Sequence, residues 1–164
     1  MLVVWPDQLT SLVAPSDLVE RLSGKTLGRD VVHDMRVRGG RQMITVFIVD
    51  DSPPVRERLV HMVSQCSGVE IVGQTGDPQA ALDAIRRSPP RVIILDIRLP
   101  GCSGIDLLPD IKKLDPAPVV IMLTNYPYPQ YRERSMKAGA DFFLNKSNEF
   151  QRIGEILEKV LSHE

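Results

Sequence analysis

Four side chains that can take part in chemistry stand directly after strand-like runs of apolar residues. Asp50 and Asp51 close the first run, Asp96 closes another, and a lysine, Lys146, follows the last. If these runs are strands of one parallel α/β sheet, their carboxyl ends meet at the crevice where such sheets bind ligands. Crowded carboxylates oppose each other's ionisation unless a cation shares the site, and Mg²⁺ plus a lysine ammonium would supply it. The pattern indicates phosphoryl transfer onto an aspartate.

Five strand-like segments alternate with five helix-like segments, which is typical of a parallel sheet covered on both faces. The predicted strands are 44–50, 69–74, 91–96, 118–123 and 140–145. The predicted helices are 53–65, 78–87, 104–114, 129–138 and 149–162. Right-handed crossovers most simply give a doubly wound five-stranded α/β sheet, flavodoxin-like (βα)5, of order 2-1-3-4-5. The first and third strands are then neighbours, which brings the three aspartates together.

Each candidate residue also has an ordinary explanation when it is taken alone. Asp51 could simply cap the helix predicted from Pro53, as acids after a strand commonly do. Lys146 could be a surface residue, and Thr124 could be an ordinary residue at a strand end. Asp96 is harder to explain in this way, because the strand before it is wholly apolar and an unpaired carboxylate is costly to bury. Because all of these residues stand at the same end of their predicted strands, their joint occurrence favours a shared site.

The composition is typical of a soluble globular protein. The 164 residues suit one domain with a sizeable core, and the net charge is −1 with 43% hydrophobic and 25% charged residues. Nucleic acids normally require a positive excess or patch, and the apolar runs are too short to cross a bilayer, so we expect neither kind of partner. Cys66 and Cys102 form no CxxC pair, which favours a reducing cytoplasm and free thiols.

The first 42 residues lack sustained periodicity. We expect residues 1–42 to be a loop-like extension with one short helix at 16–23, followed by a domain at 43–164. Met43 directly precedes the first strong strand, so the segment before it could instead result from a mis-called start. The intact mass of natively expressed protein would distinguish the two interpretations.

Four motifs in combination resemble the receiver domains of two-component response regulators, over roughly residues 43–162. They are Val-Asp-Asp-Ser at 49–52, Leu-Asp-Ile-Arg-Leu-Pro-Gly-Cys-Ser-Gly at 95–104, Met-Leu-Thr at 122–124, and Lys146. Pro100 and Gly104 match the family's turn after its phosphoacceptor, where glycine would let the loop swing into the third helix.

The resemblance implies a phosphorelay protein whose nucleophile is Asp96, phosphorylated by a histidine kinase or a phosphotransfer protein. It implies Mg²⁺ as cofactor, with Asp51 as a direct ligand and Asp50 acting partly through water. The backbone carbonyl of Arg98 would complete the protein's share, and Asp96 itself would also contact the ion. These assignments agree with the preference of Mg²⁺ for a few carboxylates, waters and phosphate oxygens.

The resemblance also implies a conformational switch. Lys146 would pair with one phosphoryl oxygen, and Thr124 would hydrogen-bond another, which draws its hydroxyl inward. Phe143 on the fifth strand would move into the vacated space, although it could also be a plain core residue. The change would alter a surface made by the fourth helix, fifth strand and fifth helix. An unknown downstream protein, or a second copy in a homodimer, would bind there.

Some residues depart from the family pattern. Ser147 follows Lys146 where many receivers have proline, so the geometry of that peptide bond is open. Arg98 and Tyr126 occupy positions beside the mouth of the site and would tune phosphate access and lifetime, in a direction that the sequence leaves open. The tyrosines of the chain fall in one stretch before the fourth helix: Tyr126, Tyr128 and Tyr131. They either form an interface or cover the helix entry.

We therefore expect a single-domain response regulator that acts by docking a partner, dimerising or passing phosphate onward. We expect no enzymatic turnover beyond slow self-phosphorylation and self-dephosphorylation. Two alternatives stay open. A phosphate-independent adaptor of receiver type would normally have an incomplete acidic pocket. An aspartyl-phosphate phosphohydrolase would need a second acid two residues after the nucleophile, where Arg98 stands.

Overall fold

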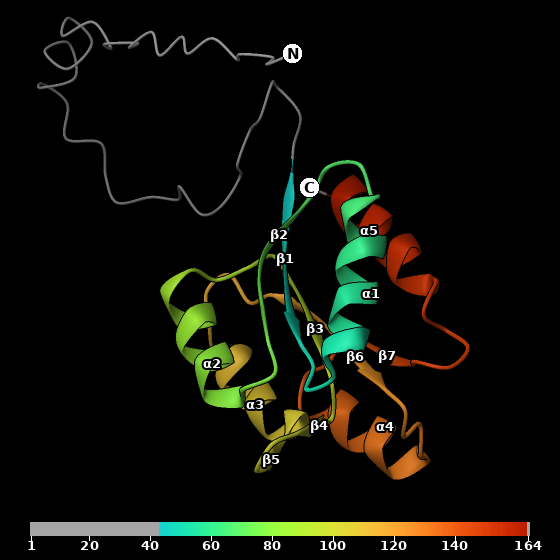
Figure 1. Cartoon of the computed structure of the whole chain (residues 1–164). Coiled ribbons are helices and arrows are strands. Elements are labelled where there is room, and N and C mark those ends of the chain that lie inside the picture. Colours follow the sequence, from blue (N-terminus) through green and yellow to red (C-terminus); the bar gives the residue numbers. More distant parts are fainter. Residues whose placement is uncertain (1–42, 164) are drawn as a thin grey trace, which may run out of the picture. The chain divides into compact units, whose positions relative to one another are not determined.

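A computed structural model of the chain describes residues 43–163. The predictions for residues 1–42, including the helix at 16–23 and the alternative start, lie outside the described residues. Figure 1 shows a parallel sheet with helices on both of its faces. The strand order β2-β1-β3-β6-β7 confirms the predicted order, because β6 and β7 are the fourth and fifth strands of this sheet. No helix in the described region is both long and apolar enough to span a membrane.

The elements follow one another as strand and helix along the chain. The strands of the main sheet are β1 (Ile44–Val49), β2 (Val69–Thr75), β3 (Val92–Leu95), β6 (Val119–Thr124) and β7 (Phe142–Asn145). The helices are α1 (Pro53–Ser64), α2 (Pro78–Arg87), α3 (Gly104–Ile111), α4 (Pro129–Lys137) and α5 (Arg152–Ser162).

The central strands are almost entirely apolar, with Thr45 and Thr124 as the exceptions in β1 and β6, because both of their faces are covered. In β1, Ile44, Val46 and Ile48 belong to a core cluster shared with α1 and α5. The alternate residues Phe47 and Val49 belong to a second cluster, shared with α2 and α3. Figure 1 shows the same division, with α1 and α5 together on one side of the sheet and α2 and α3 on the other. Such two-sided packing leaves the strand ends as the places where polar side chains can gather.

The residues that cap the N-termini of α1 and α2 lie in the loops at the carboxyl ends of the strands. Asp77 caps α2 as its sequence position predicts, and its Oδ1 accepts a hydrogen bond from the Ala80 N–H at 2.6 Å. The alternative interpretation of Asp51 as a helix cap is wrong. The residue at the N-cap of α1 is Ser52, and no side-chain capping bond forms there. Asp51 is therefore not needed to start the helix.

The sequence predictions miss one pair of strands and misplace two helix ends by three residues each, whereas the other helix ends agree to within one residue. The residues Arg98–Leu99 (β4) pair antiparallel with Cys102–Ser103 (β5) in a short hairpin between β3 and α3. Helix α3 ends at Ile111 instead of residue 114, and α5 begins at Arg152 instead of residue 149. Strands of two residues are too short to show periodicity, which is why the hairpin could not be predicted.

Candidate functional site

Lys146 joins two of the predicted acids at the carboxyl edge of the sheet. Its ammonium nitrogen Nζ lies 2.6 Å from Asp50 Oδ2 and 2.7 Å from Asp96 Oδ2. The side chains are almost completely buried, with exposed fractions of 6% for Lys146, 2% for Asp50 and 6% for Asp96. A buried charge needs a partner, and here one cation serves two anions. The predicted convergence of these strand ends is thus present in the structure.

The other oxygens of the two buried carboxylates accept backbone hydrogen bonds. Asp50 Oδ1 accepts from the Ser52 N–H at 3.0 Å, and Asp96 Oδ1 accepts from the Ile97 N–H at 2.7 Å. The backbone of Asp50 is held as well, because the guanidinium of Arg56 donates to its carbonyl oxygen at 2.6 Å. These bonds fix the orientation of both carboxylates before any ligand arrives.

Asp51 is the exposed member of the acidic group. One carboxylate oxygen from each of Asp50, Asp51 and Asp96 can be chosen so that all lie within 4.8 Å of one another. Among residues 43–163, Lys146 is the ammonium that is ion-paired to this group, so three formal negative charges against one positive leave a formal net charge of −2. Oxygen donors and a double negative charge fit Mg²⁺, which prefers a few carboxylates and completes its shell with water or phosphate. The residues present therefore fit the expected ion.

Burial and charge act in opposite directions on the groups of this site. Burial raises the pKa of Asp96 above its ordinary value, Asp50 adds to that rise, and Lys146 and the Ile97 N–H oppose it. Burial by itself would lower the pKa of Lys146, but its hydrogen bonds to Asp50 and Asp96 outweigh that effect and raise it. The lysine thus stays charged, and a further cation would favour the ionised form of Asp96.

Gly104 allows the loop after β3 to fold back against the backbone of Asp96. A Cβ atom at this position would lie 1.9 Å from the backbone oxygen of Asp96. The Gly104 N–H also donates to the Ile97 carbonyl at 2.7 Å. Any larger residue would have to push the Asp96 backbone away, so the glycine predicted at this turn is required for close approach.

Thr124 and Phe143 are both buried. Thr124 has no exposed surface, and its Oγ1 accepts a hydrogen bond from the Tyr126 N–H at 3.1 Å. Phe143 is 3% exposed and packs in the core, with the guanidinium carbon of Arg132 lying 4.7 Å from its ring centroid. In this conformation Phe143 is a core residue, and its predicted movement stays a prediction. The expected metal contact of the Arg98 carbonyl stays a prediction too.

An aromatic and cationic row lies beside the site. The Arg98 guanidinium carbon is 4.0 Å from the ring centroid of Tyr126. The Tyr126 and Tyr128 centroids are 6.4 Å apart, and those of Tyr128 and Tyr131 are 6.0 Å apart. Tyr128 is 52% exposed, whereas Tyr131 packs against the core. Tyr131 thus belongs to the packing at the helix entry, whereas an interface role for Tyr128 stays a prediction.

The loop that carries Lys146 is held by a residue that sequence reasoning missed. Glu149 Oε2 accepts a hydrogen bond from the Asn145 N–H at 3.0 Å, and its Oε1 pairs with Arg152. The Asn145 N–H and then Arg152 hold the pKa of Glu149 below its ordinary value. Among the described residues the cis peptide bond joins Asp115 and Pro116, so Lys146–Ser147 is trans. An acid just before the last helix was the available signal, because such acids commonly bond to free backbone N–H groups.

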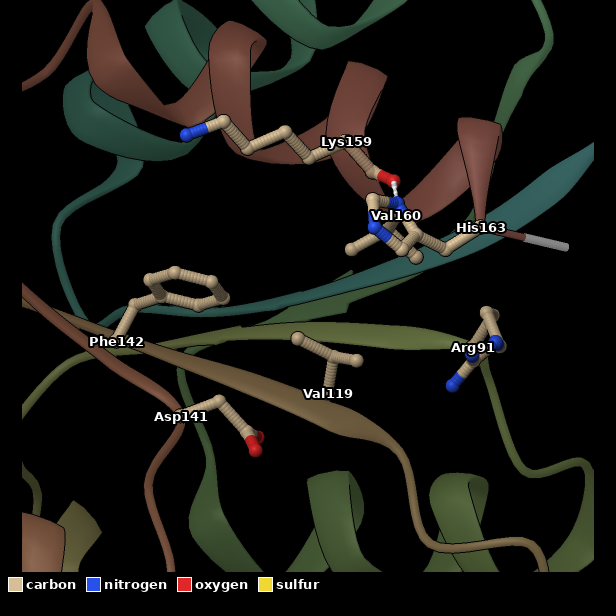
Figure 2. Close-up of a pocket in the computed structure, with 7 residues that line it drawn as sticks. All are labelled: Arg91, Val119, Asp141, Phe142, Lys159, Val160 and His163. Carbon is tan, nitrogen blue, oxygen red and sulfur yellow. Dashed lines mark hydrogen bonds between the residues drawn. The ribbon is translucent and has the colours of Figure 1, made fainter.

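A separate groove of about 380 Å³ lies at the opposite ends of the strands. Figure 2 shows Val119 and Phe142, at the amino ends of β6 and β7, facing Val160 on α5 and His163 just after the end of that helix. His163 Nδ1 lies 2.7 Å from the carbonyl oxygen of Lys159, which fixes the ring at the end of the helix. None of the predicted site residues lines this groove, so it is distinct from the acidic site.

A doubly wound parallel α/β sheet with an acidic, lysine-bridged site at its carboxyl edge defines a class of proteins that bind a charged ligand at that edge. Comparison with known proteins gives the family. The sequence matches the response regulator receiver domain over residues 46–158. The chain therefore belongs to the family of response regulator receiver domains.

Individual relatives agree with this assignment. The chain is 42% identical over 78 residues to protein-glutamate methylesterase/protein-glutamine glutaminase 5 of Anaeromyxobacter dehalogenans, covering 48% of this chain and 22% of that protein. It is 30% identical over 118 residues to the Fimbriae Z protein of Salmonella typhimurium, covering 72% and 56%. The response regulator domain of Thermotoga maritima CheB has a similar structure, with a TM-score of 0.65, 28% identity, and coverage of 74% of this chain and 96% of that one.

The match to the sequence relatives is partial. The chain spans about a fifth of the length of the methylesterase and just over half of the Fimbriae Z protein. The match to CheB, in contrast, covers nearly the whole of the solved domain. The shared part is thus the receiver domain itself.

Proposed function

We propose that this domain accepts a phosphoryl group on Asp96 from a histidine kinase or a phosphotransfer protein, with Mg²⁺ as cofactor, and thereby switches a protein-binding surface. The observation that carries the proposal is the bridge of Lys146 between Asp50 and Asp96, with Asp51 beside it. This arrangement supplies an oriented carboxylate, a fixed ammonium group and a net negative charge that favours binding of a metal ion. Membership of the receiver-domain family implies a histidine kinase or phosphotransfer protein as the phosphoryl donor. We propose that the phosphoryl transfer takes place in the cytoplasm.

Each residue has a separate part in the proposed transfer. An Asp96 carboxylate oxygen would attack phosphorus while the bond from phosphorus to the donor's histidine nitrogen breaks and the neutral imidazole leaves. The orientation of the carboxylate is set by the Ile97 N–H and by Lys146. Mg²⁺ held by Asp50, Asp51, Asp96 and the Arg98 carbonyl would offset negative charge on the phosphoryl oxygens. Lys146 would keep its charge and turn from a carboxylate oxygen toward a phosphoryl oxygen.

The output surface in this proposal is formed by α4, β7 and α5. Thr124 already holds the start of the loop before α4 through the Tyr126 N–H. A hydrogen bond from the Thr124 hydroxyl to a phosphoryl oxygen would shift that loop, and Phe143 would follow into the freed space. Tyr128, at the N-cap of α4, is 52% exposed and Met136 on α4 is 45% exposed, which suits contact with a downstream protein or a second copy.

The test is the intact mass of the protein after incubation with acetyl phosphate and Mg²⁺, for the wild type and for Asp96→Asn. We expect an added phosphoryl group on the wild type and none on the variant. A chelator present with the donor should prevent the adduct on the wild type. An equal adduct on Asp96→Asn would place the modification elsewhere and contradict the assignment.

The same experiment separates the alternatives. A folded wild type that neither binds Mg²⁺ nor gains a phosphoryl group would favour the phosphate-independent adaptor. Sustained turnover of an aryl phosphate would favour a phosphohydrolase, although the residue two positions after Asp96 is Arg98, which cannot serve as the acid. Retention of a single adduct without turnover supports the switch.

A further inference from the structure

The groove at the amino ends of β6 and β7 has no part in the proposed phosphoryl transfer. Its volume of about 380 Å³ lies within the range of small-molecule pockets. Val119 and Phe142 line its sheet side and Val160 lines its helix side, and all three residues are half-buried. Figure 2 shows these apolar side chains facing one another between the strands and α5. An apolar group that covered them would remove their surface from water, which is favourable.

Basic side chains lie around this apolar floor. Figure 2 shows Lys159 and His163 on the α5 side of the groove, and Arg91, directly before β3, also lines it. Within residues 43–163, the Lys159 ammonium makes no ion pair. His163 Nδ1 carries a hydrogen in its 2.7 Å contact with the Lys159 carbonyl, because a carbonyl oxygen only accepts. The Nε2 atom of His163 is therefore the ring nitrogen left for a ligand.

The acid that lines the groove already has its partners. Asp141 Oδ2 lies 2.6 Å from Lys112 Nζ and accepts a hydrogen bond from the Val120 N–H at 2.7 Å. Lys112 Nζ is itself held by the Pro118 carbonyl at 2.7 Å. A carboxylate paired in this way repels an approaching anion little, since the ammonium beside it has the opposite charge. The positive charge of Lys159 thus stays available to a ligand.

We propose that this groove binds a small carboxylate with an apolar tail, of the class of medium-chain fatty acids. The tail would lie on Val119, Phe142 and Val160, and the carboxylate would pair with Lys159 at the rim. Charge complementarity favours this anion over a neutral or cationic molecule with the same tail. The groove lies at the opposite ends of the strands from the acidic site, so the proposal is independent of phosphorylation.

Burial of the tail should supply most of the affinity. Complete burial of one methylene group corresponds to about a fourfold change in the dissociation constant. Because the residues that line the groove are half-buried, a bound tail would stay partly in water, and we expect about two- to fourfold per methylene. The ion pair with the exposed Lys159 should add about two- to fivefold, and salt should weaken it.

The test titrates the full chain with hexanoate, octanoate and decanoate and follows the backbone amide signals by NMR, which also locate the site. We expect saturable shifts centred on Val119, Phe142 and Val160, with a dissociation constant that falls by about two- to fourfold per added methylene. Octanol and octylammonium have the same tail without the negative charge. Both should bind more weakly than octanoate, by at least about two- to fivefold.

Substitutions separate the tail contacts from the charge. Val160→Trp would fill the groove and should abolish the shifts. Lys159→Gln should weaken octanoate by about two- to fivefold and leave octanol unchanged. Because Lys159 is exposed, this variant keeps the test decisive even if Val160→Trp does not fold. Arg87→Gln, at an exposed position on α2 across the sheet, removes the same charge elsewhere and should leave the affinity unchanged.

Several results would overturn the inference. Octanoate that causes no saturable shift at the groove residues would exclude the site. Shifts centred on Tyr128 and Met136 would assign binding to the exposed apolar side chains at α4. Equal weakening by Lys159→Gln and Arg87→Gln would reduce the effect to net charge. Groove signals that change with protein concentration alone would make the groove an interface between copies. The result for phosphorylation of Asp96 is separate, because these titrations need no phosphodonor.

Discussion

At the scale of single residues, Lys146 determines whether two buried carboxylates can lie side by side. Its ammonium is within hydrogen-bonding distance of both Asp50 and Asp96, and no side chain of the three is more than 6% exposed. The sequence placed a lysine at this strand end, but it did not show that one cation serves two acids. The lysine is thus a structural counter-ion to the two acids as well as a candidate phosphate ligand.

We predict that Lys146→Met lowers the free energy of unfolding by about 3 kcal/mol in Mg²⁺-free buffer, because it leaves two buried carboxylates without their cation. Urea unfolding at neutral pH measures the change. Adding Asp50→Asn to Lys146→Met should recover part of the loss, since one of the two uncompensated charges is then absent. A matched control is Lys112→Met, which breaks a more exposed pair with Asp141 whose side chains are 21% and 40% exposed. The prediction is contradicted if both lysine variants cost the same.

At the scale of elements, the turn from β7 into α5 depends on one carboxylate. Glu149 bonds to the Asn145 N–H and pairs with Arg152, so it ties the end of the strand to the start of the helix. Lys146 lies inside this turn, and its own N–H donates to the Thr124 carbonyl at 2.9 Å. The position of the lysine is therefore set from both sides of the loop.

We predict that the contribution of Glu149 to stability depends on pH. Its pKa is lowered in the folded protein, so its stabilisation is present above the ordinary pKa of glutamate, about 4.3, and is lost as the pH falls through the folded value. Glu149→Gln keeps a hydrogen-bond acceptor but removes the charge, which should cost about 0.5–1 kcal/mol at pH 7. Urea unfolding of both proteins at several pH values measures the difference.

The difference between wild type and Glu149→Gln should shrink toward zero in acid. Glu133→Gln, on the exposed side of α4, is the matched control and should stay within a few tenths of a kcal/mol of the wild type throughout. A Glu149→Gln difference that is constant from neutral to acid pH would show that the charge contributes nothing.

At the scale of the whole molecule, the acidic site couples ligand binding to folding. The three acids come from the ends of β1 and β3, and the lysine comes from the end of β7, so the site exists only when the sheet is formed. A ligand that binds only the folded state stabilises it by mass action. The site charge of −2 makes a divalent cation the appropriate probe.

We predict that Mg²⁺ raises the free energy of unfolding by about 2.7 kcal/mol at a hundredfold excess over its dissociation constant. Asp51→Asn should lose most of that gain. The substitution should change the metal-free stability little, because Asp51 is exposed and is not one of the carboxylates paired with Lys146. Thermal unfolding with Mg²⁺ or with NaCl at equal ionic strength measures the effect. Equal stabilisation of both proteins by Mg²⁺ would exclude Asp51 as a ligand.

The sequence by itself determined the layered sheet, its strand order and the edge at which the site lies. Apolar strands alternating with amphipathic helices allow few other arrangements, and polar residues at successive strand ends must then meet. The prediction that Asp50, Asp51, Asp96 and Lys146 form one group needed nothing more than this topology. Gly104 was predicted at its turn, although the clash that requires it was not visible in the sequence.

Only the tertiary structure decided which atoms touch. Three contacts join residues whose distance depends on how the loops pack. They are the ion pairs of Lys146 with two acids, the hydrogen bond of Glu149 to the Asn145 N–H, and the stacking of Arg98 on Tyr126. Loops have no periodicity, and a two-residue pairing such as β4 with β5 has no sequence pattern of its own. Local pattern therefore fixes where strand ends lie, whereas side-chain packing fixes the contacts that control the chemistry there.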